Sequence, residues 1–151
     1  MAASHTILVS RLILEHQGKV LLLAQTAKNG GKHTLPGGKV DVGETPITAL
    51  IREAKEEADI DISPETLKLV HVLHRQKSEA TLVIMYYKTN KWQGGLVSKE
   101  PKKFKKTIWF PILDLPKNIS KITKSVLEQY RSGVLYSEMD ERKIKTKITT
   151  I

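Results

Sequence analysis

The sequence predicts an α/β (α+β) fold, and three observations point to that class. Two apolar runs are joined by a turn near the N-terminus, an amphipathic helix follows a glycine-rich loop, and further apolar runs precede a second helix. The 151 residues suffice to bury a core without disulfides, and 40% hydrophobic and 27% charged residues are typical of globular proteins. We therefore expect one domain over residues 1–151.

The N-terminal residues predict a hairpin followed by a loop. Thr6 to Leu14 alternates and is rich in Ile, Leu and Val, and Val20 to Ala24 forms a second apolar run after the turn at residues 16–18. Residues 26–33 predict a mobile loop. This loop continues through residues 34–38, where paired glycines permit backbone conformations closed to other residues.

A first helix is predicted up to Ala58. Thr45 suits the N-cap and Pro46 the first helical position, because proline has a fixed φ and lacks the N–H that would remain unbonded there. At roughly 100° per residue, the glutamates of this helix occupy a different arc from the apolar residues. The apolar stripe consists of Ile47, Leu50, Ile51, Ala54 and Ala58.

The remaining residues predict three strands and a second helix. The strands cover residues 67–73, 80–88 and 107–110, and the middle one has the continuous apolar character of a buried strand. An apolar stripe over residues 119–130 predicts a helix that ends near Gly133. For the basic residues 139–151 we expect either a flexible tail or an edge strand.

The charge and the lack of cysteine limit the kinds of partner and active site that the protein can have. The net charge of +9 favours anionic partners, yet seven of the sixteen carboxylates lie between Asp41 and Asp61, as a cation site on a basic surface would require. No cysteine is present, which excludes thiolate nucleophiles and Cys-ligated zinc and fits the cytoplasm. The apolar stretch Ile7–Leu14 is too short to span a bilayer, so we expect no membrane partner.

Three glutamates of the first helix have the spacing of a metal site. Glu53, Glu56 and Glu57 are three and four residues apart, so their carboxylates can converge above one turn, and a hard divalent cation offsets their repulsion. We expect Mg²⁺, with Mn²⁺ as the alternative. A carboxylate that does not bind metal can accept a proton from water, and Arg52 can orient a carboxylate through its donor fork. Glu44 precedes the helix, where its charge suits the positive end of the macrodipole.

A Glu-rich helix face alone is usually a solvated surface, but here it belongs to a longer pattern. Gly38 is followed six residues later by Glu44, and Arg52 and the glutamates follow eight residues beyond. This pattern resembles the box of the Nudix hydrolase family, and it matches at every position except Asp59, where the family normally has glycine. Aspartate adopts the left-handed conformation less readily than glycine, so we expect this difference to affect stability more than chemistry.

The resemblance extends over roughly residues 6–130. Leu35 to Lys39 is similar to the loop that precedes the box in MutT-type members, although His33 replaces a tryptophan often found there. Residues 100–102, 109–110 and 113–116 are similar to the closing segment of nucleoside triphosphate members. The resemblance implies an α/β/α sandwich around a mixed sheet.

The resemblance also implies roles for residues of the box and its flanks. Metal ligation is expected from the Gly37 carbonyl, Glu53, Glu56, Glu57 and, on a later loop, Glu100. Catalytic roles are expected for Glu53, Arg52, Glu56 and Glu44.

Five residues are candidates for substrate binding. Lys39 and Arg11 can neutralise phosphates, although either can equally be a solvated surface charge. Gly38 belongs to the loop beside the expected site, and His33 is the one histidine near it. Phe110 can stack on a base, with a place in the core as the alternative.

The reaction that the resemblance implies is hydrolysis of a nucleoside diphosphate linked to another group. We expect a Mg²⁺-dependent conversion of a nucleoside triphosphate, including an oxidised or non-standard one, to monophosphate and pyrophosphate. Alternatives are ADP-ribose or a dinucleoside polyphosphate as substrate, or a non-catalytic nucleotide- or RNA-binding domain. A nucleoside di- or triphosphate is the expected partner rather than nucleic acid, and the protein is expected to be a monomer or homodimer.

Overall fold

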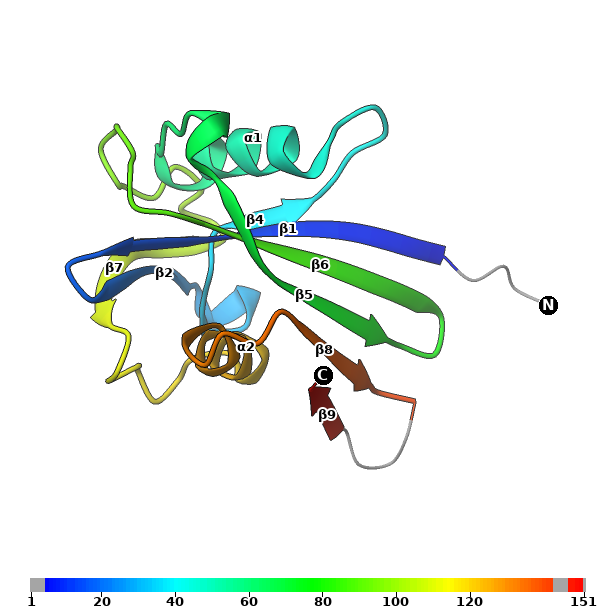
Figure 1. Cartoon of the computed structure of the whole chain (residues 1–151). Helices are drawn as coiled ribbons and strands as arrows, with labels where there is room; N and C mark the ends of the chain where they lie inside the picture. Colours follow the sequence, from blue (N-terminus) through cyan, green and yellow to red (C-terminus); the bar gives the residue numbers. More distant parts are fainter. Residues whose placement is uncertain (1–4, 143–146, 151) are drawn as a thin grey trace.

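A mixed sheet lies between two helices in the computed structural model, which describes residues 5–142 and 147–150 (Figure 1). The α/β sandwich expected from the sequence is confirmed. The helices are α1 (Pro46–Ala58) and α2 (Lys121–Arg131), with short 3-10 turns at Ala27–Asn29 and Pro64–Thr66. The strands are β1 (His5–His16), β2 (Lys19–Gln25), β3 (His33–Thr34), β4 (Gly37–Lys39), β5 (Lys68–Gln76), β6 (Ala80–Thr89), β7 (Phe104–Pro111), β8 (Tyr136–Asp140) and β9 (Lys147–Thr150).

Strand β1 organises the sheet. It runs parallel to β6 from the pair His5–Ala80 to the pair Leu14–Thr89, and it forms the predicted hairpin with β2. β4 pairs antiparallel with β1 through the pairs Val9–Lys39 and Arg11–Gly37. The sheet order is β3-β2-β1-β6-β5-β8-β9, with β7 paired to β2, and the pairs β1–β6 and β5–β8 are parallel while the others are antiparallel.

Alternation along the strands supplies a core on each face of the sheet. Successive side chains of a strand point to opposite faces, so Leu12 and Leu14 pack on the α1 side while Val9 and Ile13 pack on the α2 side. The apolar stripe predicted for α1 packs against the first of these faces. On the other face, α2 contributes Ile122, Val126, Leu127 and Tyr130.

The predicted start of α1 is confirmed by its cap. Thr45 has extended backbone angles, and its hydroxyl accepts a hydrogen bond from the Thr48 N–H while Pro46 occupies the first turn. The helix ends at Asp59, which has φ 55° and therefore adopts the left-handed conformation expected there. The second helix begins at Lys121 rather than at Ile119, because Ser120 provides its N-cap.

Other expectations were wrong in their boundaries. The predicted loop at residues 34–38 contains the end of β3 and the start of β4, because its backbone groups bond to neighbouring strands. β8 was not anticipated, and β9 pairs antiparallel with it at the sheet edge. Residues 143–146 and 151 of the predicted tail lie outside the described residues. Within the described ranges, neither helix has the length and apolar character needed to cross a membrane.

Candidate functional site

The glutamates of α1 lie against the glycines of β4. The Gly37 N–H donates a hydrogen bond of 2.7 Å to Glu57 Oε1. At Gly38 an added Cβ would lie within 3.0 Å of all three carboxyl atoms of Glu53, so a residue without a side chain is needed for this approach. The pairing of β4 with β1 therefore fixes the loop directly over two of the predicted site residues.

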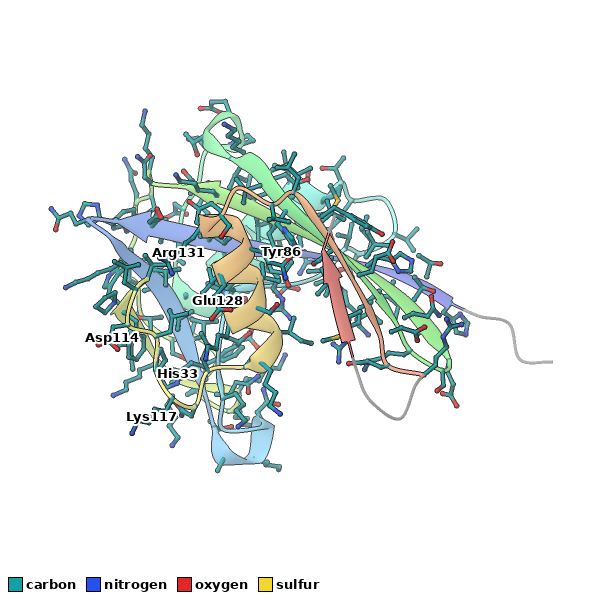
Figure 2. The ribbon with its side chains drawn as sticks, turned by 60° about the horizontal axis from the view of Figure 1, so that its bottom comes forward. His33, Tyr86, Asp114, Lys117, Glu128 and Arg131 are labelled. Atoms are coloured by element: carbon teal, nitrogen blue, oxygen red, sulfur yellow. The ribbon has the colours of Figure 1, made fainter. Side chains whose placement is uncertain are left out.

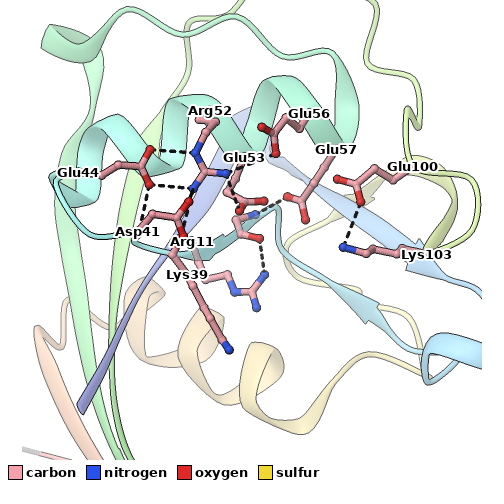
Figure 3. Close-up of polar contacts among 11 residues, drawn as sticks. Arg11, Lys39, Asp41, Glu44, Arg52, Glu53, Glu56, Glu57, Glu100 and Lys103 are labelled. Atoms are coloured by element: carbon pink, nitrogen blue, oxygen red, sulfur yellow. Dashed lines mark hydrogen bonds and ion pairs between the residues drawn. The ribbon is translucent and has the colours of Figure 1, made fainter. Parts of the chain in front are cut away.

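Arg52 joins the acidic side chains on the outer side of this contact (Figure 3). Its Nε and Nη2 each donate to one oxygen of Glu44 at 2.8 Å. Its Nη1 donates to Glu53 at 3.0 Å and to Glu56 at 3.4 Å, and Asp41 lies 3.3 Å from Nη2. The hydrogen bond from Arg52, followed by one from the Asp41 N–H, lowers the pKa of Glu44 to about 2. The orienting role expected for this arginine thus has a geometric basis.

Burial raises the pKa of two carboxyl groups, that of the buried Glu57 and that of the partly buried Glu53. Glu57 is 5% exposed, and burial raises its pKa to about 8, although the Gly37 N–H and the charge of Arg11 act in the opposite direction. Burial also raises the pKa of Glu53, and this effect outweighs the hydrogen bond from Arg52. Glu56 is half exposed by contrast. A cation near Glu57 and Glu53 would offset the cost of removing their carboxylates from water.

The oxygen atoms of these residues fit a hard divalent cation in kind, although their side chains do not meet at one point. Among the described residues, no three Asp, Glu or His side chains converge on a common point. Arg52 holds two of the glutamates, and the Gly37 N–H holds the third. Carboxylate and carbonyl oxygens are the ligands that Mg²⁺ and Mn²⁺ prefer. The pKa is raised for two of these carboxyl groups, the buried Glu57 and the partly buried Glu53. The groups that would hold the ion are Glu53, Glu56, Glu57 and the Gly37 carbonyl.

Glu100 approaches the same place from a distant part of the chain. Figure 3 shows its side chain beside that of Glu57, and its charge raises the pKa of both Glu57 and Glu53. It forms an ion pair with Lys103 at 3.2 Å. The structure therefore brings Glu100 to the acidic cluster, by which we mean Glu53, Glu56 and Glu57.

Arg11 links the cluster to a cleft on the α2 side of the sheet. Its Nη1 donates to the carbonyls of Gly37 at 3.0 Å and Leu35 at 3.2 Å, so the carbonyl expected to bind metal has a competing donor. The cleft has a volume of about 250 Å³. Its lining includes Arg11, Gln25, Thr34, Arg75, Tyr86 and Ser120. A larger hollow of about 580 Å³ lies along Arg52 and Trp92 and includes neither Glu53 nor Glu57.

The other substrate-binding candidates lie outside that cleft lining. His33 Nδ1 lies 2.7 Å from Asn118 Oδ1, and its ring contacts Phe110 edge-on at 5.1 Å between centroids. Phe110 also packs against the core cluster that contains the apolar residues of α2. His33 lies on the same side of the sheet, as Figure 2 shows. Lys39 is exposed on β4. The two aromatic candidates therefore stabilise the junction of β3, β7 and the segment before α2, and their roles toward substrate stay predictions.

Sequence reasoning missed two residues. Asp41 reaches Arg52 from the loop before α1, and only its place in the acidic segment was noted. Arg75 lies near the end of β5, beyond the strand predicted over residues 67–73. No local spacing signals its place in the cleft, because strand pairing brings it there.

Comparison with known proteins places these features in a family. The family model described as NUDIX domain matches residues 5–130. A protein of Escherichia coli named 8-oxo-dGTP diphosphatase is 31% identical over 77 residues, which cover 51% of this chain and 58% of that protein. A human protein named 8-oxo-dGDP phosphatase is 32% identical over 112 residues, covering 72% of this chain and 33% of that protein. The chain thus spans less than two thirds of the length of both relatives.

Solved structures share the fold. A crystal structure described as a MutT NUDIX hydrolase from Burkholderia pseudomallei has a TM-score of 0.75 and 27% sequence identity. The match covers 83% of this chain and 98% of that one.

Proposed function

The chain belongs to the Nudix domain family, and on that premise we propose that it is a divalent-metal-dependent hydrolase of nucleoside triphosphates. It would release a nucleoside monophosphate and pyrophosphate, with an oxidised purine nucleotide such as 8-oxo-dGTP as the substrate. Both relatives are named for an 8-oxo-dG nucleotide, which supports the oxidised base, and the name of the Escherichia coli protein supports the triphosphate. The absence of cysteine supports an assignment to the cytoplasm.

The observation that carries the proposal is the arrangement of carboxylates between Arg52 and the β4 loop. Arg52 orients Glu44 and Glu53 through short hydrogen bonds, while Glu57 is buried beneath Gly37. A solvated helix face would need neither the buried carboxylate nor the glycines that admit it. The arrangement supports a site for a cation and for the phosphates that accompany it.

The proposed reaction exchanges one bond at phosphorus for another. A water oxygen bonds to phosphorus, the bridging P–O bond breaks, and the pyrophosphate group leaves with the bridging electron pair. A bound divalent cation supplies charge neutralisation and activation of water. One carboxylate of the cluster accepts the proton of the water. Arg52 holds the Glu53 carboxylate in a single orientation for its part in the reaction.

The cleft beside Arg11 supports a position for the rest of the nucleotide. About 250 Å³ is somewhat less than the roughly 300–1,000 Å³ of complete small-molecule sites, so the cleft would take the base and part of the sugar. Arg11 borders both the cleft and Gly37. A nucleotide bound there would direct its phosphates toward the glutamates of α1.

The test is a panel of nucleotides assayed for pyrophosphate release with Mg²⁺, for the wild type and for Glu53→Gln and Glu57→Gln. We expect turnover with at least one nucleoside triphosphate and a loss of about 10²- to 10⁴-fold in each variant. Glu79→Gln, an exposed carboxylate in the β5–β6 turn, is the matched control and keeps wild-type turnover. Unchanged turnover in both site variants would overturn the mechanism. Turnover confined to ADP-ribose or a dinucleoside polyphosphate would overturn the substrate class.

A further inference from the structure

Asp59, the residue that departs from the family box, makes contacts that a glycine could not make. Its Oδ2 accepts a hydrogen bond from the Gly95 N–H at 3.1 Å. Its Oδ1 lies 2.8 Å from Lys55 Nζ and 3.1 Å from Lys99 Nζ. Two of these three partners belong to a loop about forty residues further along the chain.

That loop, residues 93–100, lies against the C-terminal end of α1. Backbone bonds join Asp61 to Gln93 in both directions, at 2.8 and 3.0 Å. The Val97 N–H donates to the Ala58 carbonyl at 3.1 Å, and Lys99 N–H donates to the Glu57 carbonyl at 3.0 Å. The loop is thus held along the last turn of the helix that carries the acidic cluster.

The approach of the loop to Asp59 leaves no room for adjustment at Gly94. A Cβ added to Gly94 would lie 2.0 Å from the Asp59 carbonyl oxygen, and Gly94 has φ +113°, which suits only glycine. At Gly95 a Cβ would lie 3.1 Å from Asp59 Oδ2. Both the backbone and the side chain of Asp59 therefore form the surface on which the loop docks.

The residue that follows this docked segment is Glu100. Its carbonyl accepts bonds from the Lys103 and Phe104 N–H groups at 2.9 Å, so a tight turn continues directly from the docked residues. Its side chain lies beside Glu57 (Figure 3). A shift of residues 95–99 would move Glu100 relative to the acidic cluster, since few rotatable bonds separate Glu100 from the docked residues.

We propose that Asp59 is a positioning residue that holds residues 95–99 on α1 so that Glu100 faces the acidic cluster. This inference rests on the proposed function for its catalytic consequence. The ion pairs with Lys55 and Lys99 are half exposed and contribute little to stability. The effect of Asp59 is therefore on geometry, and it acts chiefly through the bond that its Oδ2 accepts from the Gly95 N–H.

The activity test uses Asp59→Gly and Asp59→Asn, each alone and combined with Glu100→Gln. Glycine favours the left-handed backbone but removes the side-chain contacts, so we expect kcat to fall by about 10- to 100-fold with the nucleotide KM unchanged. Asparagine keeps an acceptor for Gly95 and restores most of the rate. In the Glu100→Gln background, Asp59→Gly changes kcat by less than about 2-fold, because the two residues act as one unit. Asp61→Asn, which removes another partner of Lys55, is the control with wild-type kcat.

A readout independent of turnover is amide hydrogen exchange at Val97 and Lys99. We expect Asp59→Gly to speed exchange at both amides, whereas Asp61→Asn and Glu100→Gln leave them protected. Unchanged exchange in Asp59→Gly would overturn the inference even if the protein hydrolyses no nucleotide. The inference would also be overturned if Asp59→Gly lowered kcat by the same factor in the wild type and in Glu100→Gln. Failure of the wild type to release pyrophosphate would refute the proposed function alone.

Discussion

Gly38→Ala displaces the Glu53 carboxylate, to which we assign a catalytic role, without removing any charge. The added Cβ would lie 2.7 Å from Glu53 Cδ, and 2.8 and 3.0 Å from its two oxygens. Ordinary van der Waals contact begins at 3.4 Å, so the carboxyl group must retreat by about 0.7 Å. Its hydrogen bond with Arg52, now 3.0 Å, would change at the same time.

A displacement of this size has a large effect on turnover and a small one on folding. Misplacement of a reacting group by about 1 Å costs about 10²-fold in rate, which corresponds to about 2.7 kcal/mol of barrier. The backbone at Gly38 lies outside the left-handed region, so alanine causes no strain there. The clash involves the flexible end of a side chain, so we expect a melting temperature close to that of the wild type.

The assay compares kcat for pyrophosphate release and the melting temperature in Gly38→Ala and Gly133→Ala. Gly133 has φ +74° and open space around it, so alanine there costs about 1 kcal/mol of backbone strain, far from the site. We expect the second variant to melt earlier but to keep wild-type kcat. Wild-type kcat in Gly38→Ala, with its fold intact, would refute the claim that Glu53 needs this position.

Three further predictions concern orientation, pH and metal. Arg52→Lys loses the paired bonds to Glu44, so we expect kcat to fall about 10- to 100-fold, and an equal rate would contradict the orienting role. Burial lowers the pKa of His71 below 6.5, so the folded state binds fewer protons than the unfolded state. The free energy of unfolding should therefore decline as pH falls below 6.5, and urea titrations of His71→Gln should show a smaller decline. The same dependence of the unfolding free energy on pH in both proteins would contradict this role of His71. Mg²⁺ at 100 times its dissociation constant should stabilise the wild type by about 2.7 kcal/mol but Glu57→Gln hardly at all, as thermal melts with and without EDTA will show.

The features predicted best from the sequence are those fixed by local physics. The N-cap at Thr45, the proline after it and the apolar stripe of α1 all depend on neighbours within one or two turns. The left-handed Asp59 was expected for the same reason. Arg52 meets Glu44 because the helix periodicity and the short preceding loop leave few other arrangements.

The features that were missed depend on pairing between distant residues. β4 has three residues, too few for a recognisable pattern, and it is a strand only because β1 lies beside it. β8 contains a serine and two acidic residues, and its place beside β5 stabilises it. The bond between Asp59 and Gly95 joins residues 36 positions apart, so no local spacing reveals it.

The most direct test is a crystal structure with Mg²⁺ and a non-hydrolysable nucleoside triphosphate. The account predicts an ion about 2.0–2.1 Å from carboxylate oxygens of Glu53, Glu56 or Glu57 and in contact with the phosphates. The base would lie in the cleft beside Arg11. A bound nucleotide whose phosphates lie elsewhere, with the glutamates still held by Arg52 and Gly37 and no ion among them, would contradict it.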